Sequence, residues 1–354
     1  MKKALKILLW TLLVLVVAFG GFLLFATITE YRPSDRENLP IDGKAALSLV
    51  DSSKDEPLSL LSWNIGFGAL GDNADFFMDG GKAVQPSDKD RVQQNIQDMI
   101  AVLKEKKSDF IFLQEVDVNS TRTYHIDETQ NFREAFADYA NAFAYNLKTE
   151  FIPYPLPPIG KVGSGLLTLS KFALTNAERT QLPVPFTWPT SMFNLKRCLL
   201  TTRIPVGDKE LVLINLHLEA YDDGEGKIAQ TNMLREIMEE ELAKGNYVIA
   251  GGDFNQTFSN ADTGKFPTKD NGWLPGIIYT SDFSDNWTFL MDSKTPSCRS
   301  LSRTYADADK DNFQYYVIDG LIISNNINVE SFEVLQKDFK ASDHNPVYLT
   351  FTLK

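Results

Sequence analysis

The segment YVIAGGDFNQ, residues 247–256, places an apolar run directly before two polar side chains, Asp253 and Asn255. One such ending says little, because chains often turn at polar residues. A whole set of them is more informative, because it contains the residue types that divalent-metal phosphoryl chemistry requires. We therefore expect these strand ends to meet at one site. The other members are Leu58–Trp63 before Asn64, Phe110–Gln114 before Glu115, Leu211–Leu216 before His217, and Ala341–Ser342 before Asp343 and His344.

Around these segments the chain alternates between short apolar runs, which predict strands, and amphipathic stretches, which predict helices. Apolar stripes predict two helices, Asp88–Lys106 and Gly226–Ala243. A chain of 354 residues with 43% apolar content can bury a large core, and we expect one large domain after a short N-terminal segment. Strands are predicted at Leu58–Trp63, Phe110–Gln114, Gly165–Ser170, Leu195–Ile204, Leu211–Leu216, Tyr247–Gly251, Tyr316–Ile323 and Pro346–Leu353.

An uncharged apolar run, Ile7–Thr29, is long enough as a helix to cross the hydrocarbon core of a bilayer. Lys2, Lys3 and Lys6 precede it, so the positive-inside rule predicts a cytoplasmic N-terminus and places everything after Thr29 outside the cytoplasm. A cleaved signal peptide is the alternative, although the run is longer than usual and no clear small-x-small cleavage site follows. We predict that residues 1–29 are an uncleaved single-pass anchor in the cell membrane.

Residues 30–57 are predicted to be a linker or an irregular lead-in to a catalytic domain of residues 58–354, because they lack sustained periodicity. Within that domain, FIPYPLPPIGK at 151–161 and VPFTWPTSMF at 184–193 are Pro-rich and aromatic, which excludes interior strands and helices. Two interpretations stay open for them. They are loops folded against their own domain, or they form the lips of a substrate cleft or touch lipid beside the tether.

Charge and cysteine content narrow the classes of function. Without its first 29 residues the chain carries 32 basic against 47 acidic side chains, a balance of −15. Such a surface repels polyanions at long range, which weighs against a nuclease without excluding one. Cys198 and Cys298 can pair in an oxidising compartment or stay separate thiols, and the sequence does not decide between these alternatives.

Six segments in order resemble the successive signature blocks of the endonuclease/exonuclease/phosphatase superfamily, the deoxyribonuclease I-like hydrolases. The resemblance spans Leu58 to Lys354, and the pair formed by GDFN and SDHNPV is highly specific. SGLLTLSKF at 164–172 and NLKRCLL at 194–200 also resemble the family, less distinctively. The six blocks are LSWNIG at 61–66, LQEVD at 113–117, INLHLEA at 214–220, GGDFNQ at 251–256, YVIDGLIIS at 316–324 and SDHNPV at 342–347.

The resemblance implies a four-layer α/β/β/α sandwich, in which two mixed β-sheets pack face to face between helices. It also implies a divalent cation, Mg²⁺ with Mn²⁺ as a substitute, because hard cations offset the negative oxygens of a phosphoester. Glu115 matches the direct metal ligand of the family. Asn64 is expected to help hold the metal or a phosphate oxygen, and Asp343 to complete the metal or water network.

The resemblance also implies catalytic roles. Asp253 matches the Asp that orients or deprotonates the attacking water, and Asn255 is expected to bond a phosphate oxygen. Asp319 matches the Asp that pairs with His344 and keeps this imidazole charged. His217 is expected to contact phosphate or protonate the leaving oxygen, and metal-bound water is the alternative proton source. Arg197 is either a phosphate clamp, because guanidinium matches phosphate bidentately, or an ordinary strand-edge arginine.

The expected activity is hydrolysis of a phosphoester, in particular a phosphodiester. A phospholipid, such as a sphingomyelin-like lipid, suits the tether and the aromatic loops, and a nucleic acid suits the catalytic blocks equally. A phosphatase of inositol phosphates or other small phosphoesters is a further option, although no Lys/Arg cluster for a highly phosphorylated ring is visible. The rival from another class is a non-catalytic, membrane-anchored binding domain. No protein partner is predicted.

Overall fold

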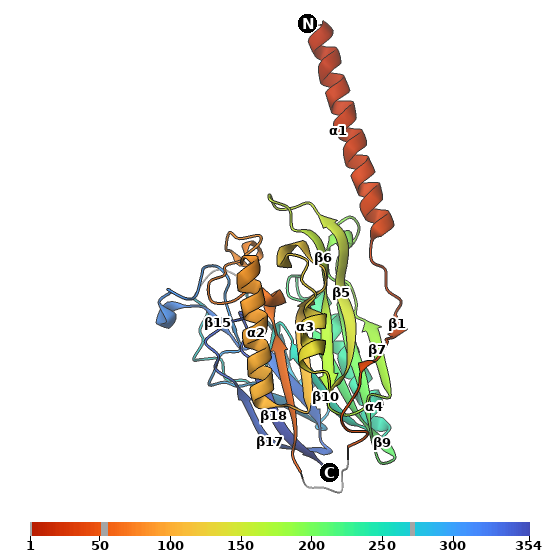
Figure 1. Cartoon of the computed structure of the whole chain (residues 1–354), viewed down its shortest axis with the longest axis vertical. Helices are drawn as coiled ribbons and strands as arrows, with labels where there is room; N and C mark the ends of the chain where they lie inside the picture. The colour runs from red at the N-terminus through yellow and green to blue at the C-terminus, as the bar shows by residue number, and fades with distance from the viewer. Residues whose placement is uncertain (1, 51–55, 270–272) are drawn as a thin grey trace.

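The computed structural model describes residues 2–50, 56–269 and 273–354 (Figure 1). Within them, the chain forms two large sheets of seven strands each, packed face to face with helices on the outside. The first sheet has the order β1 (Arg36–Asn38), β7 (Asn176–Gln181), β8 (Cys198–Val206), β9 (Lys209–His217), β10 (Tyr247–Asp253), β16 (Asp319–Ser324), β13 (Trp287–Leu290). The second has the order β17 (Ile327–Val334), β18 (Val347–Leu353), β3 (Leu58–Asn64), β4 (Phe110–Asp117), β6 (Gly160–Ser170), β5 (Ala140–Ile152), β2 (Asp42–Gly43).

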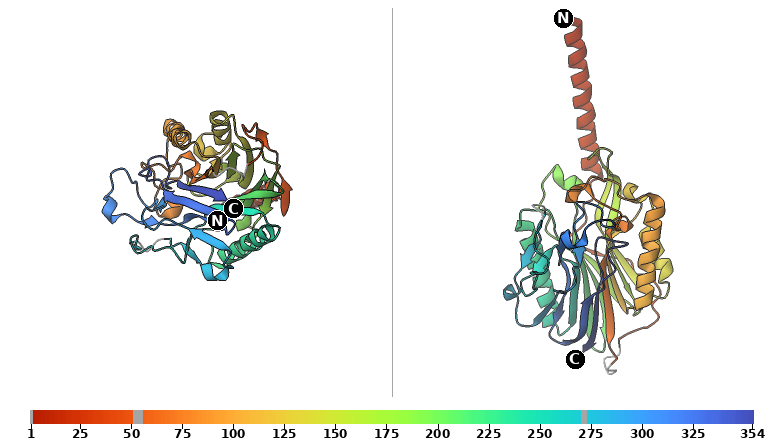
Figure 2. Two further views of the ribbon diagram at one scale, coloured as in Figure 1. Left: turned by 90° about the horizontal axis from the view of Figure 1, so that it is seen from below. Right: turned by 90° about the vertical axis from the view of Figure 1, so that its left-hand side faces the viewer.

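The helices cover the outer faces of the two sheets. Figure 2 shows α4 (Glu225–Ala243) on one side and α2 (Lys89–Lys106) on the other, and α3 (Glu128–Ala135) packs beside α2. This arrangement confirms the predicted four-layer sandwich of two mixed sheets. The small elements are β11 (Gln256–Phe258), β12 (Gly276–Ile278), β14 (Cys298–Arg299), β15 (Tyr315–Tyr316), η1 (Gly66–Gly68), η2 (Phe77–Asp79), η3 (Thr121–Thr123), η4 (Thr190–Phe193), η5 (Thr280–Asp282) and η6 (Lys310–Asn312).

Alternation along the strands builds three apolar layers, because successive side chains of a strand point to opposite faces. In β9, Leu211 and Leu213 enter the core between the two sheets, whereas Val212 and Ile214 pack against Leu234 of α4 and its neighbours. Each fully buried aliphatic side chain contributes about 1.5–3 kcal/mol. The strands are therefore continuous apolar runs, because both of their faces are covered.

The two predicted helices match α2 and α4 within one residue at their first position. The Asp88 side chain caps α2 by accepting a hydrogen bond of 2.8 Å from the Arg91 amide. One stripe of α2, which includes Ile96 and Leu103, is buried against the second sheet. Lys107 ends the helix in the left-handed conformation.

Two predicted strands have different limits in the structure. The strand predicted at Leu195–Ile204 begins at Cys198, because Lys196 instead bonds the Asn146 carbonyl. The strand predicted at Tyr316–Ile323 is split, since Tyr316 pairs with Cys298 in the small β14–β15 sheet and β16 begins at Asp319. The apolar patterns do not predict β5, β7, β13, β17 or α3, and the four strands are defined by their partners in the sheets.

The segment between the N-terminal helix and the domain lies along the sheet edges. Its strand β1 pairs with β7, β2 pairs with β5, and Leu47 forms a bridge with Phe172. Val50 is buried in the core between the sheets. Residues 51–55 of the predicted 30–57 lead-in lie outside the described residues.

The N-terminal helix α1 (Lys2–Thr29) projects from one end of the sandwich, and the C-terminus lies at the opposite end (Figure 1). Its mean hydropathy reaches 2.7, and its 28 residues make it a candidate transmembrane span by length and composition. The tip of the β5–β6 hairpin points toward the same end (Figure 1). The end of the domain that carries α1 is therefore also the end where the long hairpin closes.

Candidate active site

Strand pairing brings the predicted polar residues to one end of the sandwich. The parallel strands β9 and β10 place His217 directly opposite Asp253, and the antiparallel pair β10–β16 places Asp319 opposite Asp253 on the other side. In the other sheet, β3 and β4 run parallel and pair as far as Asn64 and Gln114. Residues at or near the ends of strands from both sheets therefore meet where the sheets face each other.

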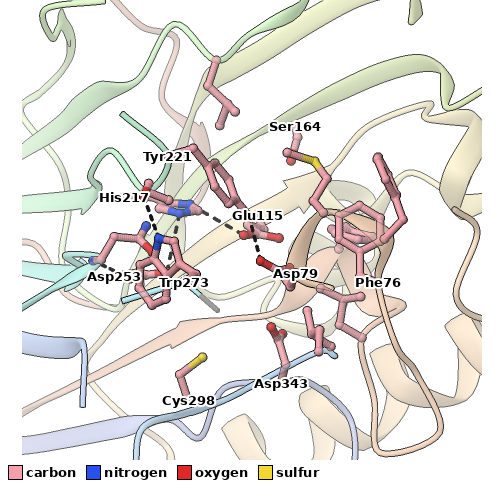
Figure 3. A pocket seen from close by; sticks show the side chains of 18 of the residues that line it. Phe76, Asp79, Glu115, Ser164, His217, Tyr221, Asp253, Trp273, Cys298 and Asp343 are labelled. Carbon is pink, nitrogen blue, oxygen red and sulfur yellow. Dashed lines mark hydrogen bonds and ion pairs between the residues drawn. The ribbon is translucent and has the colours of Figure 1, made fainter. Parts of the chain in front are cut away.

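Glu115 reaches this meeting point through a bulge in β4. The pairing of β4 with β6 shifts register between Leu113 and Val116, and Glu115 has a φ of 56°. The left-handed conformation strains the backbone of a non-glycine residue, and such strain often marks functional sites. The half-buried Glu115 side chain faces a cleft that also contains His217 and Asp253 (Figure 3).

Asn64 joins the two sheets at the floor of the cleft. Its Nδ2 donates to Glu115 Oε1 at 3.2 Å and to Asp253 Oδ2 at 3.0 Å, and its Oδ1 accepts from the Gly66 amide at 3.0 Å. Asn64 is buried, so these bonds fix the spacing of the two carboxylates. In this geometry the amide of Asn64 positions Glu115 and Asp253 relative to each other.

His344 and Asp319 form the predicted pair. His344 Nδ1 and Asp319 Oδ2 are 2.8 Å apart, and Nε2 of the same ring lies 3.8 Å from Asp253 Oδ2. Burial alone lowers the pKa of His344, but Asp319 together with Cys298 and Asp343 outweighs it and leaves the pKa well above its usual range. The buried imidazole is therefore positively charged at neutral pH and points its second nitrogen toward the cleft.

His217 has the opposite electrostatic character. Its Nε2 lies 3.5 Å from Asp253 Oδ2, and its Nδ1 lies 3.9 Å from Glu115 Oε1. Burial, reinforced by the nearby charges of Arg197 and His344, holds the pKa of His217 well below its usual range. Asp253 therefore lies between a charged imidazole, that of His344, and a neutral imidazole, that of His217.

The carboxylates of Glu115 and Asp343 fit a hard divalent cation. Burial raises the pKa of Glu115, and repulsion by Asp343 raises it further. Burial also raises the pKa of Asp343. Two carboxylates that repel each other are stabilised by a nearby cation, and oxygen donors are the ligands that such cations prefer. Ligand-type atoms of Cys298, Asp343 and His344, and those of Asp253, Asp319 and His344, also lie within 4.8 Å of one another in each group.

The two remaining predicted residues lie at the edge of this cluster. Asn255 has a φ of 51°, its amide donates to Asp253 Oδ1 at 2.8 Å, and its Nδ2 bonds the Leu218 carbonyl at 2.9 Å. Arg197 Nε lies 3.3 Å from Glu219 Oε2, and its Nη1 donates to the His217 carbonyl at 3.1 Å. Both residues line the cleft, and both hold the backbone next to a catalytic-type side chain.

The cleft itself has a volume of about 690 Å³, and its lining includes Asp79 and Tyr221, two polar residues that were not singled out from the sequence. The Tyr221 hydroxyl donates to Asp79 Oδ1 at 3.2 Å, which joins the β9–α4 connection to η2 (Figure 3). Burial and repulsion by Asp343 raise the pKa of Asp79 to about 7. Neither residue belongs to an apolar run or a family block, so only their juxtaposition identifies them.

His125 and Cys198 lie outside the cluster, whereas Cys298 lies beside Asp343 and His344. His125 is exposed, and its Nδ1 lies 2.8 Å from Asn119 Oδ1. Cys198 is buried in β8 as a free thiol, and Cys298 is a second free thiol. The structure therefore does not pair the two cysteines.

A family model described as the Endonuclease/Exonuclease/phosphatase family matches residues 61–344. The chain belongs to this family, whose members are phosphoester hydrolases and are generally dependent on divalent metal ions. No curated protein matches the sequence significantly. The family membership agrees with the fold and with the cluster of carboxylates and imidazoles at the strand ends.

Solved structures of this family share the fold. The chain is similar to an endonuclease/exonuclease/phosphatase from Beutenbergia cavernae DSM 12333, with a TM-score of 0.54 and 18% identity over 84% of this chain and 72% of that chain. It is similar to one from Bacteroides vulgatus, with a TM-score of 0.53 and 14% identity over 85% and 100%. It is also similar to the human Nocturnin catalytic domain with bound sulfate anion, with a TM-score of 0.51 and 16% identity over 89% and 97%. At these identities the likeness establishes the fold and not the substrate.

Proposed function

We propose that this protein hydrolyses phosphodiester bonds with the help of a bound divalent cation, Mg²⁺ or Mn²⁺. The observation that carries the proposal is the continuous network Glu115–Asn64–Asp253–His344, in which neighbouring polar atoms are 3.0–3.8 Å apart. Carboxylates, an amide and a charged imidazole are the groups that phosphoryl transfer to water needs. They come from distant parts of the chain and meet at the floor of one cleft.

Glu115 and Asp343 are the proposed metal ligands, and Asn64 holds Glu115 in place from the side. A bound cation would neutralise charge on the phosphate oxygens and so reduce their repulsion of the nucleophile. The elevated pKa of Glu115, which burial and Asp343 cause, supports this assignment because a cation relieves both effects.

Asp253 is the proposed base for the attacking water. Burial and the neighbouring Asp319 raise the pKa of Asp253 to about 7, close to the value at which a general base works best at neutral pH. Asn64 and the Asn255 amide each donate to one of its carboxylate oxygens, which fixes the orientation of the carboxylate. Asp253 can thus orient water and accept its proton.

The charged His344 is proposed to stabilise the extra negative charge of the transition state, and Asp319 keeps it charged. His217 is proposed to contact the phosphate as a neutral imidazole. Because burial and Arg197 lower its pKa, the ring is not an imidazolium at neutral pH and is a poor general acid before the reaction begins. Asn255 is proposed to bond a phosphate oxygen at the cleft wall, and Arg197 to support His217 or to meet the phosphate itself.

Turnover of bis(p-nitrophenyl) phosphate by the detergent-solubilised full chain tests the proposal. We expect turnover with Mg²⁺ or Mn²⁺ that EDTA abolishes, and a drop of several orders of magnitude in His344→Ala. Asp285→Asn, an exposed acid away from the cleft, is the matched control and keeps wild-type turnover. If the wild-type chain shows no metal-dependent turnover of this ester or of other phosphoesters, the non-catalytic binding domain is the better interpretation.

We further propose that α1 is a single-pass anchor with its N-terminus in the cytoplasm, because three lysines precede the apolar run. Protease added to intact cells then removes the domain that follows α1, whereas a tag before Lys2 stays protected. Complete protection of the domain would contradict this orientation or reveal an outer barrier. Mass spectrometry of the mature N-terminus distinguishes the anchor from a cleaved signal peptide.

A further inference from the structure

The last turns of α1 pack against two loop regions of the catalytic domain, the tip of the β5–β6 hairpin at residues 151–159, which includes the end of β5, and the loop 184–193. The Phe22 ring stacks on Phe193 with centroids 6.1 Å apart and meets Phe151 edge-on at 6.3 Å. Closer to the helix end, Thr27 Oγ1 lies 3.3 Å from Met192 Sδ, and Trp188 Nε1 donates to Thr27 Oγ1 at 3.3 Å. These contacts therefore run along the helix from Thr27 back to Phe22, about 8 Å along its axis.

These contacts place both loops at the level of the bilayer if α1 spans it. About 20 helical residues cross the hydrocarbon core, so a span that begins at Ile7 ends near Ala26. Phe22 lies inside that span. Its partners Phe193 and Phe151 must then lie at the same depth, because ring contacts of this kind fix their positions relative to Phe22.

The loops present large apolar side chains that the domain leaves uncovered. Leu156 at the hairpin tip is 87% exposed and Trp188 is 57% exposed. Single exposed apolar residues are common on protein surfaces, but these gather beside α1, whose own exposed apolar surface is expected to lie in a bilayer. Tryptophan and tyrosine also prefer the interface between lipid and water, where Trp188 and Tyr154 would lie.

A polar cluster of Glu30, Arg32 and Lys196 follows this apolar zone, next to the C-terminal end of α1. Glu30 accepts a hydrogen bond of 2.9 Å from Lys196 Nζ and one of 3.0 Å from Arg32 Nε. Burial raises the pKa of Glu30, but Lys196 and Arg32 together outweigh it and keep this carboxyl ionised. Along α1 and the residue that follows it, the contacts change from apolar rings at Phe22 to ion pairs at Glu30. This is the change in polarity that the edge of a bilayer requires.

The same two loops form one wall of the catalytic cleft. Ile152, Pro153, Tyr154 and Ile159 of the hairpin and Phe193 of the second loop line the cleft, whose floor contains Glu115 and His344. Phe193 therefore contacts α1 and also lines the cleft. An apolar wall leads in this way from the membrane helix to the catalytic cluster.

We propose that α1, the tip of the β5–β6 hairpin at residues 151–159 and the loop 184–193 together form a bilayer-embedded rim, and that the substrate is a membrane phospholipid whose hydrocarbon lies along the apolar wall of the cleft. The phosphodiester of the lipid reaches the Glu115–Asp253–His344 cluster without leaving the membrane surface. Water adds to phosphorus and one P–O ester bond breaks, which yields a phosphomonoester and an alcohol. The proton that Asp253 accepts from water is balanced by one that the leaving oxygen takes up. This inference rests on the proposed phosphodiesterase function.

The depth of the rim can be measured without any enzymatic turnover. Leu156→Cys and Leu47→Cys carry a nitroxide label in the full chain, reconstituted in phosphatidylcholine and phosphatidylglycerol vesicles. Leu47 is the matched control, because it is 48% exposed and forms a β-bridge with Phe172. Phe172 follows the end of β6 that lies farthest from the hairpin tip. Both native cysteines are buried, which keeps the labelling specific. Power-saturation electron paramagnetic resonance with oxygen and a water-soluble nickel chelate then reports depth.

We expect the label at position 156 to favour oxygen over the nickel chelate by at least severalfold, and the label at 47 to show the reverse. Equal, water-like accessibility at both positions would overturn the rim. If the label at 156 is shielded from both reagents, the loop is covered by protein and the proposal is equally wrong.

Activity separates this inference from the proposed function on which it rests. The double variant Leu156→Ser/Trp188→Ser should keep bis(p-nitrophenyl) phosphate turnover, because neither residue lines the cleft, and should lose at least 10-fold on phosphatidylcholine, phosphatidylglycerol or sphingomyelin vesicles. Wild-type turnover of the soluble ester and of DNA or RNA, with no product from any vesicle, would overturn the lipid substrate and leave the phosphodiesterase intact. No turnover of the soluble ester would instead overturn the proposed function itself.

Discussion

The floor and the rim of the cleft are built from different kinds of residue and by different forces. On the floor, Asn64, Asp253 and His344 are buried polar groups whose atoms lie 3.0–3.8 Å apart at the ends of strands. At the rim, Phe22, Phe151 and Phe193 are aromatic residues that join the N-terminal helix to two loops. The floor depends on electrostatics in a region shielded from water, whereas the rim depends on apolar contact.

This difference suggests a division of roles, in which the floor provides the chemistry of hydrolysis and the rim provides the access of the substrate to the floor. Under the proposed function, a change on the floor should alter how every phosphodiester reacts, regardless of how the substrate arrives. A change at the rim should alter only how a membrane-bound substrate reaches the floor. Variants that affect one property without the other therefore test the division, and variants that affect both would break it.

The largest effect is expected for Asp253→Asn on the floor. Asparagine keeps the shape but cannot accept the proton of water, so kcat should fall by about 10³-fold or more on both soluble ester and vesicles. The melting temperature should stay the same or rise slightly, because burial and Asp319 already disfavour the charge of Asp253. Stopped-assay kinetics and thermal melting provide the check, and near-wild-type kcat would remove Asp253 from the mechanism.

A smaller effect on both substrates is expected for Asp319, which supports His344 from behind. Asp319→Ala removes the 2.8 Å partner of Nδ1 and should lower kcat by about 10²–10³-fold, whereas Asp319→Asn keeps a hydrogen-bond acceptor and should retain more activity. The order wild type, Asn, Ala in kcat is the expected outcome. If Asn and Ala variants are equally active as wild type, His344 does not depend on this pair.

Glu30→Gln should affect the rim alone. It weakens the bonds to Lys196 and Arg32 that hold the end of α1 against the domain, so we expect a loss of about 3–10-fold on vesicles and none on the soluble ester. Faster cleavage by trypsin at Arg32 or Arg36 in detergent would report the loosened junction. Arg32→Gln, which removes only the more exposed partner, is the control and should have the weaker effect. An equal loss on both substrates would argue that the rim and the floor are not separate.

The smallest effect on activity is expected for Glu241→Gln, which touches neither region. Glu241 pairs with Arg203 at 2.8 Å behind the first sheet, and although burial raises its pKa, bonds from Arg203, Lys244 and Asn246 lower it to about 2. At pH 7 the variant should keep wild-type kcat but lose about 1–2 kcal/mol of unfolding free energy, an amount discounted for screening at the partly exposed Arg203.

The sign of the pH dependence follows from the depressed pKa of Glu241 in the folded state. Its contribution is fully present above about pH 4.5, where the unfolded chain is also ionised, and is lost as the pH falls toward 2. Urea unfolding at several pH values should therefore show the difference between wild type and Glu241→Gln shrinking below pH 4.5. A difference that stays constant down to pH 3 would mean that the pair is not the source of the stability.

Much of the floor could be predicted from the chain, because most of the candidate catalytic residues follow a short apolar run in a recognisable block. His217, Asp253 and His344 lie together as the blocks indicate, and the two long helices match their apolar stripes. The bond between Asp79 and Tyr221 could not be predicted, because both residues lie in irregular segments without periodicity. Strands such as β17 were missed for a related reason, since its central residues are largely exposed and polar and it is defined by pairing with β18.

The amino-acid sequence alone determined the family and the residue types of the floor, because short motifs encode them directly, and the layered architecture followed from the family that those motifs resemble. Only the tertiary structure decided that Glu115 enters the cleft through a bulge and that α1 meets two Pro-rich loops through Phe22. A bulge depends on the register between neighbouring strands, and a helix–loop contact depends on where distant segments come to lie. Neither property is carried by any single stretch of the chain, so both appear only when the sheets have formed.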